Sequence, residues 1–375
     1  MADTQQHFRT CHLCEAMCGI IIEHQGEQIL SIKGDPDDPL SRGNICPKAV
    51  ALQDLQSDPD RLRQPMKRVG TEWMPVSWDH AYEEIENRFK AIRSEHGKHS
   101  LAVYAGNPTA HSAGAILFLP NLIRAFAGRN RFSATSVDQL PHMLTSYKLF
   151  GNQALFTIPD LDRCEHLLII GANPGASNGS LMTVPDVRAR IKALTARGKL
   201  VVIDPRRTET AELASEHHFI TPAGDVYFLI AFLQALQQLG PPRLNAYAGK
   251  LQGFEQAITA IGAFRIADIA KRTAIPAETI TRMASDFYQA PRAVAYGRMG
   301  VSVQAHGSLC QWLLQLINLY TGNLDKPGGA LVNDAVLPIT GPGTSPGARG
   351  SGSAKAAPRS RRPASISCRT ARGSI

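Results

Sequence analysis

The sequence contains no uninterrupted apolar run close to the roughly 18 residues that a membrane-spanning helix needs. Its first residues, MADTQQHFRT, lack the basic segment followed by apolar residues that marks a secretory signal peptide. We therefore expect neither a membrane span nor export, and we expect a cytoplasmic protein. The sequence also lacks internal repeats, which excludes a solenoid or a propeller.

Cysteines are few and odd in number, seven among 375 residues. In a cytoplasmic chain this count argues against a disulfide framework and favours metal binding or free thiols. Apolar residues make up 43% and charged residues 19% of the chain, so most of it is expected to be globular. The length is sufficient for two or three domains.

Outside residues 341–375 the chain carries almost no net charge. The formal net charge of +8 includes seven basic and no acidic residues within 341–375. The preceding residues carry 33 basic and 32 acidic side chains, a net charge of +1. Nucleic-acid binding needs a strongly basic surface, so we expect no nucleic-acid partner.

Residues 341–375 differ in composition from the rest of the chain, because they are mainly Gly, Ala, Pro, Ser, Lys and Arg. Such a segment cannot bury enough apolar surface to fold alone, and we predict a disordered basic tail. We interpret the residues after about 347 as the product of a shifted reading frame, with a genuine disordered linker as the alternative. Cys368 lies in this tail and receives no role.

The N-terminal 60 residues carry cysteines and two strand-like segments, GIIIEH and EQILSIKG, joined at Gln25-Gly26. Residues 61–76 are predicted to be an extended linker because they contain Pro65 and Pro75. A helix is predicted over about 79–95, with apolar residues on one face and Ser77 or Asp79 as its cap.

Strand and helix patterns then alternate. Strands are predicted at 101–106, within 166–174 with a break at Gly171, at 199–207 and at 292–297, and helices near 185–197, 225–239, 265–290 and 306–321. This alternation predicts an α/β fold with an open parallel sheet covered by helices on both faces. We predict a small strand-rich domain over 1–60, an α/β region over 61–340 and the tail over 341–375.

The strongest chemical signal is a set of four cysteines: Cys11, Cys14, Cys18 and Cys46. Three lie within eight residues, and 27 residues separate the third from the fourth across the predicted hairpin. Four thiolates can hold one 4Fe–4S cluster, in which each iron takes one sulfur from the protein. A tetrahedral zinc site is the rival, although zinc usually favours paired two-cysteine knuckles. Ordinary buried thiols are a further alternative, as predicted for Cys164 and Cys310.

These cysteines, together with CPK (46–48), DPDRLRQPM (58–66) and PVSWDHA (75–81), resemble the start of the molybdopterin oxidoreductase family, of the dimethyl sulfoxide reductase and formate dehydrogenase type. The resemblance continues to about residue 340. It includes the segments GANPGASN (171–178), IDPRRTETA (203–211), ITPAGD (220–225), AYGRMG (295–300) and TGNLDKPGG (321–329).

The resemblance implies a molybdenum or tungsten bis(molybdopterin guanine dinucleotide) cofactor beside the cluster. Its loops follow predicted strands, at the sheet edge where open α/β folds bind ligands, and backbone N–H groups there suit pyrophosphate. We expect Asp204 to accept from a guanine or a ribose, Arg206 to contact phosphate and Asp225 to recognise guanine. The complete set of expected cofactor-binding residues is Lys48, Gly171, Asn173, Pro174, Asp204, Pro205, Arg206, Pro222, Gly224, Asp225 and Gly300.

Two catalytic positions are also implied. Lys48 stands two residues after Cys46, where the family has a lysine between cluster and pterin that assists electron transfer. A gapless count back from Gly151 in GNQA places the metal ligand at Asp138, with Ser136 as runner-up; a helix cap is the plainer reading of Asp138. Gln139 departs from the formate dehydrogenases, which have a catalytic histidine there. His142 and His306 are candidates to line the site, although a lone histidine is more often structural.

The sequence therefore predicts an oxidoreductase that passes electrons between a metal-bound small molecule and the cluster. An electron-transfer protein or subunit is the expected partner. Catalytic chains of the family are far longer than this one, which implies impaired activity. The alternative is a non-catalytic iron–sulfur module for electron transfer or assembly.

Overall fold

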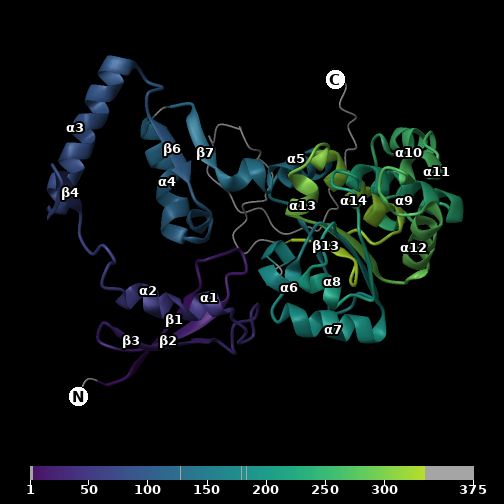
Figure 1. The fold of residues 1–375 in the computed structure, drawn as a ribbon, viewed down its shortest axis with the longest axis horizontal. Coiled ribbons are helices and arrows are strands. Elements are labelled where there is room, and N and C mark those ends of the chain that lie inside the picture. Colours follow the sequence, from purple (N-terminus) through teal and green to yellow (C-terminus); the bar gives the residue numbers. More distant parts are fainter. Residues whose placement is uncertain (1–2, 127, 179, 183, 334–375) are drawn as a thin grey trace. The chain divides into compact units, whose positions relative to one another are not determined.

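The computed structural model describes residues 3–126, 128–178, 180–182 and 184–333 (Figure 1). The chain divides into two compact units. Within the described residues, the first consists of 3–126, 128–134 and 184–185, and the second of 135–178, 180–182 and 186–333. The predicted tail at 341–375, with Cys368, lies outside the described residues.

The first unit opens with a three-stranded antiparallel sheet in the order β1-β2-β3. Its elements are β1 (Gln5–Thr10), β2 (Gly19–Gln25) and β3 (Gln28–Gly34), followed by α1 (Pro47–Val50) and α2 (Leu52–Ser57), which pack against β3. The predicted turn is confirmed, because Gly26 takes a φ of +55° that suits glycine. Strand β1 was not predicted, since QQHFRT is exposed throughout and has no apolar alternation.

A hairpin, a long helix and a βαβ segment complete this unit. They are β4 (Met66–Val69), β5 (Glu72–Pro75), α3 (Trp78–His96), β6 (Ala102–Ala105), η1 (Asn107–His111), α4 (Ala113–Phe126) and β7 (Asn130–Ser133). The predicted linker over 61–76 is wrong where β4 pairs with β5, because Gly70 makes the turn at a φ of +63°. Ser77 caps α3 as predicted, accepting from the His80 N–H. Strand β6 pairs in parallel with β7, in a sheet of its own.

The second unit is built around a parallel sheet. Its elements are η2 (Ala134–Val137), α5 (Leu140–Phe150), β8 (Thr157–Pro159), β9 (His166–Ile170), α6 (Pro174–Ser177), η3 (Ser180–Met182), α7 (Val187–Arg197), β10 (Lys199–Ile203), α8 (Glu209–Glu212), β11 (Glu216–His218), α9 (Asp225–Leu239), η4 (Asn245–Tyr247), α10 (Phe254–Gly262), α11 (Ile266–Ala270), α12 (Ala277–Gln289), β12 (Ala293–Gly297), α13 (Met299–Ser302), α14 (Gly307–Tyr320) and β13 (Ala330–Val332). The helix predicted over 265–290 is divided into α11 and α12, since Pro276 lacks the N–H that a continuous helix needs.

The four strands of this sheet run in the order β11-β10-β9-β12, all parallel. Leu168 and Ile170 of β9 belong to a core formed with α9, α12 and α14. The alternate residues Leu167 and Ile169 point to the other face, where α7 packs along β10 and buries Ile191. Helices thus cover both faces, and β9 is buried along its whole length, as the continuous apolar run predicted.

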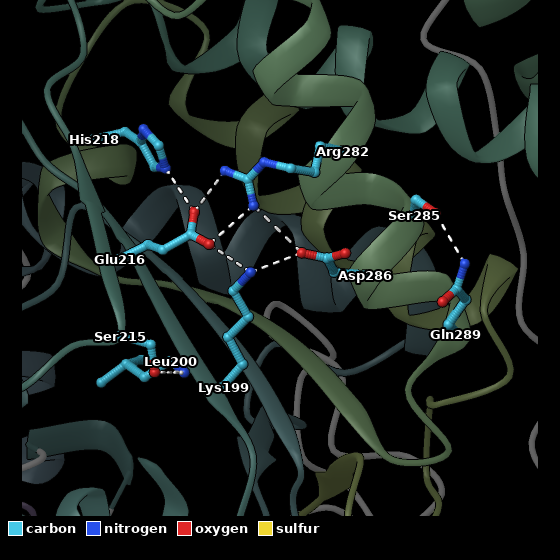
Figure 2. A network of polar contacts seen from close by, with 9 residues as sticks. All are labelled: Lys199, Leu200, Ser215, Glu216, His218, Arg282, Ser285, Asp286 and Gln289. Carbon is cyan, nitrogen blue, oxygen red and sulfur yellow. Dashed lines mark hydrogen bonds and ion pairs between the residues drawn. The ribbon is translucent and has the colours of Figure 1, made fainter.

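Charged side chains gather at the start of β10 and β11 (Figure 2). Glu216 receives hydrogen bonds from both guanidinium nitrogens of Arg282, at 2.8 and 2.9 Å, and an ion pair from Lys199 at 2.5 Å. Lys199 also contacts Asp286 of α12 at 2.7 Å, and His218 contacts Glu216. The network connects α12 to the amino ends of the strands. Ligands of open α/β folds bind at the opposite, carboxyl ends.

Candidate functional site

The four predicted cluster ligands lie in the first unit, on two loops. Cys11, Cys14 and Cys18 occupy the turn between β1 and β2, where the Cys11 N–H donates to the Cys18 carbonyl at 2.8 Å. Cys46 is the residue that precedes α1. Cys11 is buried, and the other three are half-buried.

The four thiols influence one another electrostatically. Burial raises the pKa of Cys11, nearby Cys14 and Cys46 raise it further, and the Arg9 guanidinium opposes the rise. Burial, followed by the same neighbouring thiols, raises the pKa of Cys18 to about 11. Thiolates that repel one another in a low-dielectric site are stabilised by cationic metal, which suits this donor set to iron.

No three His, Cys, Asp or Glu side chains of the described residues come close enough to hold a single metal ion. A four-iron cluster makes a different demand, because each thiolate ligates its own iron. Lys48 extends from an exposed position on α1, two residues after Cys46. Its ammonium group is therefore available to a partner outside the cluster loop.

In the second unit, the loops after β9 and β12 meet at the carboxyl edge of the parallel sheet. Gly171 follows β9 with a φ of +57°, and its carbonyl accepts from the Gly300 N–H at 3.0 Å. A Cβ on Gly171 would lie 2.7 Å from the Val301 nitrogen, so a larger residue would push the two loops apart. Gly300 itself is exposed, and its backbone is accessible to a ligand.

The loop beyond Gly171 is fixed by hydrogen bonds to α8. The Asn173 amide donates to Glu209 at 2.6 Å, and its oxygen accepts from the Thr210 hydroxyl at 2.8 Å. Pro174 is buried at the start of α6. Asn173 and Pro174 therefore order the loop, and their own polar groups are engaged within the protein.

The loop after β10 presents charge to solvent. The Asp204 carboxylate accepts from the Arg206 N–H at 2.8 Å, and this turn leaves Pro205 and the Arg206 side chain exposed. The Arg206 guanidinium is 66% exposed and lies 3.7 Å from Glu209, a loose pair. An exposed guanidinium at this edge is able to take a phosphate.

Asp225 begins α9 and is the buried carboxylate of this edge, 6% exposed. Burial raises its pKa, an amide hydrogen bond from Gln304 opposes the rise, and the Asp204 carboxylate adds to it. Gly224 is buried before it, and Pro222 is exposed. The structure thus brings Asp204 and Asp225 from separate loops into electrostatic contact at the same edge.

Asp138 also belongs to this unit, between η2 and α5. Its Oδ1 forms an ion pair with Nη1 of Arg298 at 2.7 Å, which links it to the loop after β12. The helix-cap reading finds no support, because α5 has Gln139 at its N-cap and no side-chain cap bond. Ser136, the alternative ligand, is exposed.

The two histidines differ in environment. His142 on α5 is 3% exposed, packs edge-on against Phe156, and neither ring nitrogen has a partner among the described residues. Burial, with the nearby Arg298 charge, lowers its pKa to about 3, so the imidazole is neutral. His306 is exposed before α14. Cys164 and Cys310 are buried thiols as predicted, each with its pKa raised by burial to about 12.

Sequence reasoning missed two residues at this edge, Arg298 and Gln304. Arg298 lies inside the quoted segment AYGRMG, and its side chain is only 12% exposed. A charged residue in an otherwise apolar strand-to-turn segment was the available signal. Gln304 donates to the Gly300 carbonyl at 2.9 Å, a local contact between the end of α13 and the residues that follow it, which no periodicity indicates.

Comparison with known proteins gives the family. The profile of the molybdopterin oxidoreductase family matches residues 61–342, and that of the molybdopterin oxidoreductase Fe4S4 domain matches residues 9–57. The chain belongs to the molybdopterin oxidoreductase family. This membership confirms the resemblance and indicates a molybdopterin cofactor and a 4Fe–4S cluster, which decides against the zinc alternative.

The relatives are enzymes with longer chains. The periplasmic nitrate reductase of Desulfovibrio desulfuricans is 25% identical over 336 residues, covering 85% of this chain and 43% of that protein. The molybdopterin-containing subunit of thiosulfate reductase from Salmonella typhimurium is 26% identical over 328 residues, covering 85% and 41%. This chain thus spans less than half the length of these relatives.

The fold also has a counterpart among solved structures. The structure of acetylene hydratase from Pelobacter acetylenicus superposes with a TM-score of 0.71 at 22% identity. The match covers 84% of this chain and 43% of that one. This likeness confirms the predicted α/β fold class. None of the helices in the described residues is both long and apolar enough to cross a membrane.

Proposed function

We propose that the protein is a molybdenum- or tungsten-dependent oxidoreductase that passes electrons between a small-molecule substrate and a 4Fe–4S cluster held by Cys11, Cys14, Cys18 and Cys46. The observation that carries this proposal is the placement of three cysteines on the β1–β2 turn and of Cys46 before α1, within the segment that the Fe4S4 domain profile matches. When bound, the molybdopterin cofactor and the cluster supply the redox chemistry, and the protein supplies orientation and electrostatics.

In this proposal the carboxyl edge of the parallel sheet holds the dinucleotide part of the cofactor. The exposed Arg206 guanidinium binds phosphate, and Asp204 and Asp225 accept from guanine or ribose. Gly171, Asn173 and Pro174 order one loop, while Pro222, Gly224 and Gly300 keep the neighbouring backbone close to the edge. Lys48 carries its positive charge toward the pterin and assists electron transfer.

Asp138 remains our proposed ligand of the metal. Carboxylate oxygen suits a high-valent, oxygen-preferring metal. The support from the structure is its connection through Arg298 to the Gly300 loop. Arg298 then orients the carboxylate, as a hydrogen-bonded second residue usually does for a metal ligand.

The rival function is an iron–sulfur module without molybdenum. One sample of anaerobically purified chain separates the two. Absorbance at visible wavelengths together with iron and molybdenum or tungsten analysis should give about four irons and one molybdenum or tungsten per chain if the oxidoreductase proposal holds. Iron without molybdenum or tungsten would establish the module, and a preparation without iron would refute both.

We further propose cytoplasmic location, an electron-transfer protein or subunit as partner, and domain boundaries near residues 60 and 340. The six described cysteines are free thiols, which a reducing compartment maintains. A periplasmic relative shows that location varies among similar proteins, so fractionation of the native host is the direct measurement.

A further inference from the structure

An open pocket of about 170 Å³ lies in the first unit, between the β1–β3 sheet and α2. Ile20 and Ile32 form part of its floor, Leu55 is on its α2 side, and Arg9, His12 and Arg61 contribute polar groups. Apolar cavities of about 150 Å³ accept a benzene-sized group. The pocket is therefore large enough for one apolar side chain of another protein.

The floor of this pocket is continuous with the packing around the cluster ligands. Ile20 and Ile32 belong to the same buried apolar cluster as Cys11, and Cys18 packs against that cluster. A group seated in the pocket thus contacts the same apolar cluster to which the cluster ligand Cys11 belongs. That continuity suits electron exchange with a partner.

The charge around the pocket has one sign. Its described lining residues include Arg9, His12 and Arg61 and no acidic residue. Residues 9–57 as a whole contain seven acidic and four basic side chains, so the basic lining is a local feature and not an average one. Charge complementarity therefore favours an acidic partner surface.

Local structure fixes both arginines. Arg9 pairs in register with Ile20 across β1 and β2, which places it on the pocket face of the sheet. Arg61 follows a turn in which its N–H donates to the Asp58 carbonyl at 3.2 Å, and its Nη1 lies 3.5 Å from the Leu55 carbonyl. Leu55 itself is 52% exposed beside them. Binding hot spots often combine an apolar surface with an arginine that is held in place before the partner binds.

We propose that this pocket is the docking point of an acidic iron–sulfur electron-transfer protein. The partner seats an apolar side chain against Leu55 and places carboxylates against Arg9 and Arg61. One electron then passes between the two clusters, so that one is oxidised and the other reduced by the same electron, with no bond made or broken. The proposal rests on the proposed function, because it requires the cluster on Cys11, Cys14, Cys18 and Cys46.

The test is the rate at which a reduced, acidic two-cluster bacterial ferredoxin reduces the cluster of the full chain. Cluster content is first established by absorbance, iron analysis and reduction with dithionite. At about 10 mM ionic strength we expect the double variant Arg9→Glu/Arg61→Glu to react about tenfold more slowly than the parent. At about 0.5 M the two rates should converge, and dithionite should reduce both proteins equally.

Lys33→Glu is the control, and it is compared with the single variants Arg9→Glu and Arg61→Glu because each of the three makes the same charge change. Lys33 neighbours Ile32 along β3 and therefore faces away from the pocket. We expect it to change the rate by less than about twofold. Leu55→Ser tests the apolar seat and should slow the reaction at both ionic strengths, because salt does not screen apolar contact.

Equal slowing by Lys33→Glu would mean that overall charge and not this pocket controls the rate, and would overturn the proposal. Unchanged rates in both the arginine and the Leu55 variants would also overturn it. A parent chain that binds no iron would instead refute the proposed function. If the double-glutamate chain loses iron, the milder Arg9→Gln/Arg61→Gln chain is used, with an intermediate loss of rate expected.

Discussion

The guanidinium of Arg298 lies 2.7 Å from the carboxylate of Asp138, and the two residues are 160 positions apart in the sequence. The pair fastens the segment before α5 to the loop after β12. Side-chain exposures of 12% for Arg298 and 35% for Asp138 place it between a surface pair and a buried one. It joins the proposed metal ligand to a glycine loop of the proposed cofactor edge.

This pair should contribute measurably to stability. We expect the single variants Asp138→Asn and Arg298→Gln each to lower the unfolding free energy by about 1–2 kcal/mol, because each removes a partly buried, hydrogen-bonded ion pair. A double-mutant cycle from urea unfolding should give a coupling near 1 kcal/mol. The exposed pair Arg206–Glu209, at 3.7 Å, serves as the control and should couple by less than about 0.5 kcal/mol. Equal coupling in the two cycles would contradict the prediction.

The cluster assignment predicts a sharp effect of one cysteine. Cys14→Ser should abolish the brown absorbance and destabilise the β1–β2 loop, because cluster binding and local folding are coupled. Iron content and the visible spectrum are the measurements. Cys310→Ala, which removes a buried thiol of the other unit, should leave both unchanged. Full iron content in the Cys14→Ser protein would show that Cys14 is not a ligand.

The lowered pKa of the buried His142 leads us to predict that the stability of the protein depends on pH. Its folded-state pKa of about 3 lies below the usual value of about 6.5, so the unfolded chain takes up the proton first as the pH falls. Stability is therefore lost as the pH drops from about 6.5 toward 3. At pH 8 we expect the unfolding free energy of His142→Leu to lie within about 1 kcal/mol of that of the parent. On lowering the pH to 5, the unfolding free energy of the parent should fall by about 2 kcal/mol relative to that of the variant.

Urea midpoints across this pH range provide the measurement. His166 is buried with a pKa lowered by burial to about 4, but it is present in both proteins, so only their difference is read. His306→Asn changes an exposed residue at a φ of +65°, which asparagine tolerates, and serves as control. Parallel pH curves for the parent and His142→Leu would rule out the buried neutral imidazole.

We predict a second contribution to stability that is lost in acid, from the ion pairs of Glu216 (Figure 2). Hydrogen bonds from Arg282, and further contacts from Lys199 and His218, hold the pKa of Glu216 well below its usual value although burial opposes this. The network therefore stabilises the fold above a pH of about 4.3 and loses that contribution as the pH falls further.

Glu216→Gln should accordingly be less stable than the parent at pH 7, and the difference should shrink below a pH of about 4. Thermal or urea unfolding at several pH values measures it. Glu278→Gln, at an exposed position on α12, should show no comparable loss at pH 7. A difference that persists unchanged at pH 3 would argue that packing, and not charge, is responsible.

Elements with a strong local signal were predicted well. Helix α9 occupies the predicted span, because a long apolar run follows a glycine, and the hairpin at Gly26 follows from alternating residues and a turn glycine. Strand β1, the β4–β5 hairpin and α4 were not predicted. The strands are largely exposed and show no apolar alternation, whereas α4 is rich in apolar residues but contains Pro120, which sequence reasoning takes as a helix breaker.

The sequence by itself predicted an iron–sulfur cluster, which the family supports, because four cysteines are close along the chain and their spacing carries the signal. Only the tertiary structure decided which side chains meet at the sheet edge. The pairing of Asp138 with Arg298, the contact of Gly171 with Gly300 and the burial of His142 depend on strand order and loop packing. Long-range packing leaves no periodic trace in the sequence, so such contacts cannot be read from it.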